Sequence, residues 1–157
     1  MSGQILVHST CVEIGGKGVL LRGPSGAGKS DLAFRLIRSP AQARLVADDQ
    51  VVLENEAERL FASAPPVLAG LLELRGLGLV AMPAVARTQV ALVIDLVPRD
   101  DVPRLPEARA CVLCGVELPL LALHAFDLTV VDKVGLAVDL IPAKGFPGDD
   151  GRLGERP

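Results

Sequence analysis

Short apolar runs separated by glycine-rich or charged turns fill the beginning of the chain. The runs at 5–7, 11–14 and 19–22 are rich in Ile, Val and Leu, and Gly15–Gly18 is a turn signal between the last two. We expect 5–7 and 11–14 to form an N-terminal β-hairpin. We expect 19–22 to form a buried strand, because its apolar residues are continuous.

The following segments alternate between helical and strand patterns. Residues 31–38 carry apolar side chains at helical spacing, and the helix should end before Pro40 because a residue that precedes proline avoids the α conformation. Further strands are expected at 44–47, 51–53, 90–97 and 118–124, and a terminal helix at 128–140. This order predicts an α/β fold, with a right-handed crossover between the parallel strands that flank the first helix.

The length and composition fit one domain. The chain has 157 residues, of which 50% are apolar, so a hydrophobic core can form without disulfide or metal staples. We interpret residues 1–141 as a single domain. Residues 142–157 are rich in Gly, Pro and charge, and we expect them to form a mobile C-terminal tail.

The composition also argues against nucleic-acid and membrane functions. The formal net charge is -3, which gives no basic footprint for nucleic acid. With four Phe and no Trp or Tyr, we do not expect a stacking platform for bases or single-stranded nucleic acid. Every apolar run is shorter than the ~20 residues of a membrane helix, and the N-terminus lacks the pattern of a signal peptide. We therefore expect a cytoplasmic protein.

The three cysteines include one C-x-x-C pair, Cys111 and Cys114, with Cys11 far from both. The sequence offers no second Cys or His pair at zinc-ligand spacing, and the C-x-x-C follows a Pro-rich loop instead of opening a helix after a strand. We favour structural thiols, with redox or metal function as the alternative.

A glycine-rich segment directly after the strand at 19–22 matches the phosphate-binding pattern G-x-x-x-x-G-K-[ST] at every position. Its glycines let backbone N–H groups turn inward onto phosphate oxygens, and the helix that follows adds partial positive charge. Lys29 would place a charge on the β- and γ-phosphates, and the Ser30 hydroxyl would ligate Mg²⁺. The residues predicted to bind the nucleotide are Gly23, Ser25, Gly26, Ala27, Gly28, Lys29 and Ser30.

Two adjacent carboxylates, Asp48 and Asp49, follow the strand at 44–47, where a P-loop protein places a second group for the metal. One could orient Mg²⁺ or its water, and the other could accept a proton from an attacking hydroxyl. Asp95 is a competing candidate, but we favour the adjacent pair because it directly follows the P-loop helix and offers two carboxylates. A turn pair without catalytic function is the alternative.

Two further charged residues, Glu73 and Arg75, lie inside an otherwise apolar stretch. The leucines on both sides predict partial burial, and a partly buried Glu and Arg suggest metal or phosphate contact, with a plain ion pair as the alternative. His8 lies in the expected hairpin, where a lone histidine is more often structural, and we interpret His124 as structural as well.

Taken together, four segments resemble the catalytic domain of HPr kinase/phosphorylase. They are Val7-His8, GPSGAGKS at 23–30, LVADD at 45–49 and LELRGLGLV at 72–80. Enzymes of that family phosphorylate a serine of HPr, the phosphocarrier of the sugar phosphotransferase system, and reverse the reaction with inorganic phosphate. The resemblance implies a P-loop kinase-like domain in which helices flank a mixed central sheet, the architecture of PEP carboxykinase-like P-loop proteins.

The resemblance also implies roles for the acidic pair and for the histidine. Asp48 would be the general base that accepts the serine proton, and in the reverse reaction it would return that proton to the serine oxygen. Asp49 would support both the metal and the base. His8 matches the active-site histidine of the family and would tune the proton transfer.

The remaining implied roles concern metal, phosphate and substrate. Glu73 would hold Mg²⁺ alongside Ser30 and Asp49, and Arg75 would neutralise phosphate charge. Arg87 is expected to contact the substrate. The sequence departs from the family at Pro24, where Asp is frequent, and it starts at the catalytic domain, as in the compact form of some proteobacteria.

The function implied by the resemblance is therefore an ATP- and Mg²⁺-dependent serine kinase acting on HPr, with phosphorolysis as a further activity and a homo-hexameric assembly. Two alternatives remain from the residues themselves. The first is a P-loop kinase of a small hydroxyl metabolite, and the second is a nucleotide-binding regulatory module with little catalysis.

Overall fold

The computed structural model describes residues 3–140 of the 157-residue chain, so the tail expected at 142–157 lies outside the described residues. The strands are β1 (Gln4–Val7), β2 (Thr10–Ile14), β3 (Lys17–Arg22), β4 (Arg44–Ala47), β5 (Val51–Glu56), β6 (Arg59–Ser63), β7 (Leu71–Leu74), β8 (Gly78–Ala81), β9 (Arg87–Leu96), β10 (Ala110–Leu113) and β11 (Val116–Leu123). The helices are α1 (Lys29–Arg38) and α2 (Val130–Leu140), with 3-10 turns at Pro66–Leu68 and Arg99–Asp101. Within this described part, neither helix has the length and hydropathy to span a membrane.

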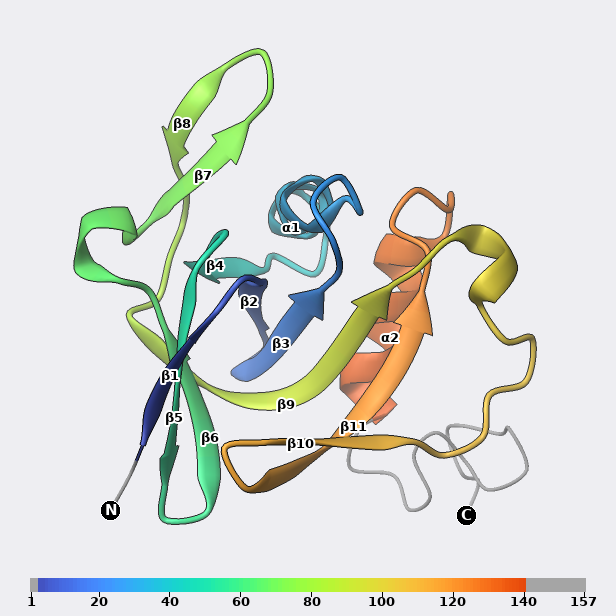
Figure 1. Cartoon of the computed structure of the whole chain (residues 1–157). Helices are drawn as coiled ribbons and strands as arrows, with labels where there is room; N and C mark the ends of the chain where they lie inside the picture. Colours follow the sequence, from blue (N-terminus) through green and yellow to red (C-terminus); the bar gives the residue numbers. More distant parts are fainter. Residues whose placement is uncertain (1–2, 141–157) are drawn as a thin grey trace.

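Strand β9 occupies the middle of a curled mixed sheet (Figure 1). The strand order is β1-β5-β6-β9-β3-β2-β4, and β11 adds to the end of β9 and carries β10 on its other side. β9 pairs parallel with β3 and β11 and antiparallel with β6. The predicted α/β fold with a mixed central sheet is therefore confirmed.

Alternating side chains of β3 divide the core into two clusters, because successive residues of a strand point to opposite faces. Val19 and Leu21 pack with the buried sides of both helices. Leu20 faces a second cluster that includes Leu53 of β5 and Ala62 of β6. The strand that leads into the glycine-rich loop is thus buried on both faces.

The N-terminal strand departs from the expected hairpin. β1 pairs antiparallel with β5, whereas β2 forms its hairpin with β3. Gly15 and Gly16 have φ values of 57° and 83°, and two consecutive positive φ angles suit the tight turn that a two-residue hairpin needs. The link between β1 and β2, His8-Ser9, has no glycine to supply such a turn, so β1 pairs elsewhere.

The direction of the strands determines where the loops meet. β2 lies antiparallel between β3 and β4, so β3 and β4 run in the same direction. β9 and β11 run parallel to β3 through their ladders. The segments that follow β3, β4, β9 and β11 therefore lie at one edge of the sheet, which is where open α/β sheets bind ligands.

Candidate functional site

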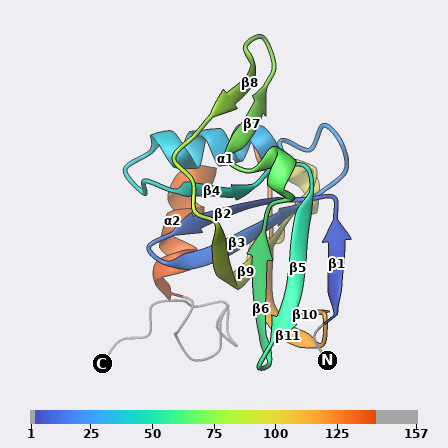
Figure 2. The same cartoon turned by 90° about the vertical axis from the view of Figure 1, so that its left-hand side faces the viewer.

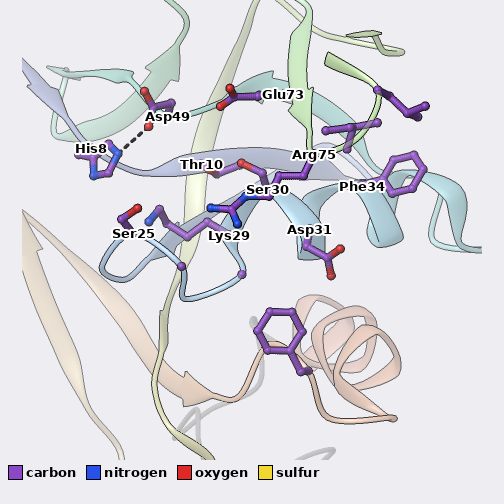
Figure 3. A pocket seen from close by; sticks show the side chains of 15 residues that line it. His8, Thr10, Ser25, Lys29, Ser30, Asp31, Phe34, Asp49, Glu73 and Arg75 are labelled. Carbon is purple, nitrogen blue, oxygen red and sulfur yellow. Dashed lines mark hydrogen bonds and ion pairs between the residues drawn. The ribbon is translucent and has the colours of Figure 1, made fainter. Parts of the chain in front are cut away.

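A pocket of about 590 Å³ opens over the glycine-rich loop between β3 and α1 (Figure 3). Its walls come from the turn after β1, the loop itself, α1, the turn after β4, the β7–β8 hairpin and the connection between β11 and α2. Of the predicted site residues, the lining includes His8, Ser25, Gly26, Gly28, Lys29, Ser30, Asp49, Glu73 and Arg75. The fold thus brings together residues from distant parts of the sequence.

Gly28 shows why the loop needs glycine at its last turn. Its φ is 98°, in the left-handed region that side chains rarely adopt. A Cβ at this position would also lie 2.7 Å from Cβ of Ala125 and 2.8 Å from the ring of Phe126. Both the backbone conformation and the close approach of the β11–α2 connection therefore require glycine here.

The loop is closed by hydrogen bonds to its own carbonyl groups. The Ala27 N–H donates to the Pro24 carbonyl oxygen over 3.0 Å. The Lys29 ammonium group donates to the carbonyl oxygens of Gly23 (2.6 Å) and Pro24 (3.1 Å), and this residue is 8% exposed. The lysine charge is therefore held within the loop, where phosphate oxygens would meet it.

Asp48 lies directly behind Ser30 and is buried. Its Oδ1 accepts hydrogen bonds from the hydroxyl groups of Ser30 (2.6 Å) and Thr10 (2.9 Å), and its Oδ2 accepts one from the backbone N–H of Glu73 (3.2 Å). These contacts join β2, α1 and β7 through one carboxyl group. A hydroxyl and a carboxyl group in contact at a P-loop can together position a divalent cation.

Asp49 points into the pocket, where its Oδ1 lies 2.5 Å from Nε2 of His8. Both side chains are more than half exposed, and Figure 3 marks the contact between them with a dashed line. The φ of Asp49 is 67°, a conformation that Asp and Asn tolerate better than other non-glycine residues and that often occurs at functional sites. The side chains of the two adjacent aspartates therefore point in different directions: Asp48 contacts Ser30, and Asp49 contacts His8.

The β7–β8 hairpin carries Glu73 and Arg75 beside the pocket and projects from the rest of the fold (Figures 1 and 2). Both charged residues are exposed, so the predicted partial burial is wrong. β7 and β8 pair with each other as a separate two-stranded sheet. Leu77 and Leu79, 76% and 64% exposed, consequently lie in solvent and do not cover their charged neighbours.

Two residues considered from the sequence lie elsewhere. Asp95 forms an ion pair with Arg22, accepting from its guanidinium group over 2.7 and 3.1 Å. Arg87 contacts Glu54 and Glu56 and lies 3.7 Å from the centre of the Phe61 ring. The structure therefore does not bring Arg87 to the pocket.

The cysteines are all free thiols. Burial raises the pKa of Cys111 and Cys114, and much more strongly that of Cys11, so all three are protonated at neutral pH. Across residues 3–140, no three Cys, His, Asp or Glu side chains gather in the way a metal centre built from protein ligands alone requires.

Thr10, Phe34 and Phe126 are among the pocket residues that the sequence did not predict as site residues. Thr10 belongs to β2, and its hydroxyl reaches Asp48 because β2 lies between β3 and β4. The phenylalanines come from α1 and from the β11–α2 connection. Each stands in a segment without a recognisable motif, and the fold brings them to the glycine-rich loop.

The model of the family described as HPr Serine kinase C-terminal domain matches residues 1–119 of the chain. Among curated proteins, the chain is 35% identical over 147 residues to an HPr kinase/phosphorylase of Lactobacillus acidophilus, covering 86% of this chain and 43% of that protein. It is 38% identical over 129 residues to the HPr kinase/phosphorylase of Geobacillus thermodenitrificans, covering 74% and 41%. The chain thus spans about two fifths of the length of these relatives.

A solved structure resembles most of this fold. The protein titled Hpr(Ser) kinase/phosphatase from Coxiella burnetii superposes with a TM-score of 0.76 at 26% sequence identity. The match covers 86% of this chain and 94% of that one. The arrangement of the mixed sheet and helices is therefore shared with that protein over nearly its entire length.

Proposed function

The chain belongs to the HPr serine kinase C-terminal domain family, and from that premise we propose that it uses ATP and Mg²⁺ to phosphorylate a serine of the phosphocarrier protein HPr. The names of its relatives and of the solved neighbour support this proposal. The observation that carries it is the hydrogen bond between Ser30 and Asp48, because it places a carboxyl group directly beside a phosphate-binding loop.

In the proposed reaction, the loop and two cationic side chains bind the triphosphate. The backbone N–H groups of the loop and the N-terminus of α1 bind phosphate oxygens. Lys29, held in the loop, exchanges its carbonyl partners for the β- and γ-phosphates. Arg75, beside the pocket, neutralises charge on the transferred group. Positioning and charge neutralisation of this kind supply most of the catalysis in phosphoryl transfer.

The oxygen donors near Ser30 fit Mg²⁺. Ser30 is assigned as a ligand together with Asp49 and Glu73, all of which line the pocket. Mg²⁺ is usually bound by one or two carboxylates together with substrate phosphates and water, so a complete set of protein ligands is not required. When bound, the cation neutralises negative charge on the phosphate oxygens during transfer.

Asp48 is assigned as the general base. A serine Oγ–P bond forms as the bond between the γ-phosphorus and its bridging oxygen breaks, ADP leaves, and the serine proton passes to Asp48. Its Oδ2 accepts a single hydrogen bond, from the Glu73 N–H, and so retains acceptor capacity. Asp49 and His8, in contact with each other, support the base and tune the proton transfer.

The reverse reaction is proposed to use the same groups. An oxygen of inorganic phosphate attacks the phosphorus of phosphoserine, pyrophosphate forms, and protonated Asp48 returns its proton to the serine oxygen as the O–P bond breaks. Microscopic reversibility assigns the same residue as base in one direction and as acid in the other.

The partner and the assembly are also part of the proposal. Arg87 lies outside the pocket, so we assign it as a contact for a protein acceptor and not for a small one. By family resemblance we propose a homo-hexamer, which light scattering on the purified chain would test. We place the reaction in the cytoplasm, where ATP is available.

The decisive experiment is the intact mass of purified HPr after incubation with the full chain and Mg-ATP. The expected result is a gain of one phosphate, which a serine-to-alanine change at the acceptor site of HPr abolishes. Excess phosphate added afterward should remove the mass gain and release pyrophosphate. A chain that binds ATP but leaves the mass of HPr unchanged would contradict the assigned acceptor.

A further inference from the structure

The pocket has two chemically different ends. His8 and Asp49 stand at one end, and Lys29 and Ser30 lie in the middle (Figure 3). Phe34 marks the other end, beyond Asp31 on α1 (Figure 3). Leu74, Leu77 and Phe126 add apolar surface to the pocket, and Phe126 lies against Gly28 and near Arg35 of α1.

The difference between the two ends predicts how a bound nucleoside triphosphate is oriented along the pocket. Lys29 reaches the β- and γ-phosphates in a loop of this type, and the backbone N–H groups cradle the α- and β-phosphates. The γ-phosphate must face the acceptor, which places it toward Asp48, Asp49 and His8. The nucleoside then extends the opposite way, past Asp31 and toward the two phenylalanines.

Phe126 is half exposed, yet neighbouring groups hold its ring in place. A Cβ built at Gly28 would lie 2.8 Å from this ring, so the ring packs closely against the glycine-rich loop. The guanidinium group of Arg35 lies 5.9 Å from its ring centre, pairs with Asp31 over 2.9 Å and donates to the Ala125 carbonyl oxygen. The residue as a whole is 54% exposed. A positioned aromatic ring that keeps an open face can stack on a nucleobase at little further entropic cost.

We propose that Phe126, which lines the same pocket as Phe34, forms the subsite for the nucleobase of the triphosphate. This inference rests on the proposed nucleotide-dependent function and adds the residue that receives the base. The chain has four Phe and neither Trp nor Tyr, and two of those four line this pocket. The small aromatic content led us to expect no stacking platform, but the fold brings two of the four phenylalanines to one pocket.

Recognition by a ring face has a consequence for specificity. Every nucleobase has a π-face, so stacking tolerates different bases and discriminates weakly between them. Arg35 and Asp31, the nearest charged pair, already bind each other. ATP and GTP are therefore expected to bind with comparable affinity.

The test compares ATP with inorganic tripolyphosphate, which carries the phosphates without a base. In the full chain, Phe126→Ala is expected to raise the Kd for ATP about tenfold, the usual scale for losing one stacked base, and to leave the Kd for tripolyphosphate unchanged. Leu128→Ala is the matched control, because Leu128 is 98% exposed in the same connection and lies outside the lining. This control should bind both ligands as the unaltered chain does.

A second variant gives a direct spectroscopic readout. Phe126→Trp introduces the sole tryptophan of the chain, so its fluorescence reports this position alone. ATP and GTP should both quench the emission, and tripolyphosphate should not.

The outcomes separate the subsite from the proposed function. An unchanged ATP affinity in Phe126→Ala, or an equal loss for both ligands, overturns the nucleobase subsite and leaves the kinase proposal standing. Equal quenching by tripolyphosphate in Phe126→Trp does the same. An unaltered chain that binds neither ligand overturns the proposed function, and the subsite with it.

Discussion

Asp48 joins three segments of the fold through single hydrogen bonds. Its partners come from β2, from the first turn of α1 and from the backbone of β7. A carboxyl group placed this way can act on chemistry at Ser30 and also fix the position of the β7–β8 hairpin. A variant at Asp48 therefore has to be measured for both its catalytic activity and its folding stability.

The Asp48→Asn variant keeps the shape of the side chain and removes its ability to take up a proton. We expect ATP affinity to be retained and phosphoryl transfer to HPr to fall by roughly 10²–10⁴-fold, the usual contribution of a general base. Calorimetric ATP titration and the rate of HPr mass gain measure the two effects, and a urea midpoint monitors folding. Full transfer activity in a folded variant would remove Asp48 from the role of base.

Lys29→Ala tests the phosphate loop itself. The variant loses the buried ammonium group that now contacts the Gly23 and Pro24 carbonyls, so ATP binding should become undetectable by calorimetry. Lys133→Ala is the matched control, because Lys133 is an exposed lysine on α2. An ATP affinity that survives Lys29→Ala would refute the assignment of this loop.

At the residue scale, the sequence identifies candidate site residues where one continuous segment carries the expected chemistry. The loop motif at 23–30 is one continuous segment, and so is the Asp48–Asp49 pair. The structure places Ser30 of the first segment in contact with Asp48 of the second. Thr10 and Phe126 could not be found this way, because their approach to the loop depends on which strands are neighbours. The exposure of Glu73 was also missed, since burial of the leucines beside it depends on whether another element covers the hairpin.

At the scale of elements, apolar patterning located most strands and both helices, but it did not identify their partners. Residues 5–7 do form a strand, which pairs with β5 instead of β2. Local pattern gives strand propensity and turn chemistry, whereas pairing across long sequence separations is decided by the packing of the complete sheet.

Helix α2 contains a glycine whose replacement should stabilise the protein. Gly135 lies in the helix interior, and a Cβ there would meet nothing within 4 Å. Gly135→Ala is expected to raise the free energy of unfolding by about 0.5–1 kcal/mol, because alanine loses less backbone entropy on forming a helix. Urea unfolding measures the change.

Gly28→Ala is the contrasting substitution, since positive φ and the nearby Phe126 ring both oppose a side chain there. It should lower stability and weaken ATP binding together. A Gly135→Ala variant that is less stable than the unaltered chain would contradict the helix-interior argument.

At the scale of the whole molecule, the candidate site depends on the complete sheet. Loops after β4 and β11 contribute to it as well as the glycine-rich loop after β3, and the β7–β8 hairpin adds the wall that carries Glu73 and Arg75. The fold shared with the Coxiella burnetii protein therefore places the site, while the side chains of this chain determine what it binds.

The central position of β9 also determines when, during synthesis, the growing chain can first bind nucleotide. β3 leaves the ribosome well before β9, its parallel partner, and at about 5–20 residues per second the delay lasts seconds. During that time the nascent chain contains the entire phosphate motif and the β2–β3 hairpin, but lacks the strand that pairs with the other edge of β3. A chain stopped at residue 86 should therefore fail to bind ATP, a deficit that calorimetry would detect, so nucleotide binding begins only when synthesis has passed β9.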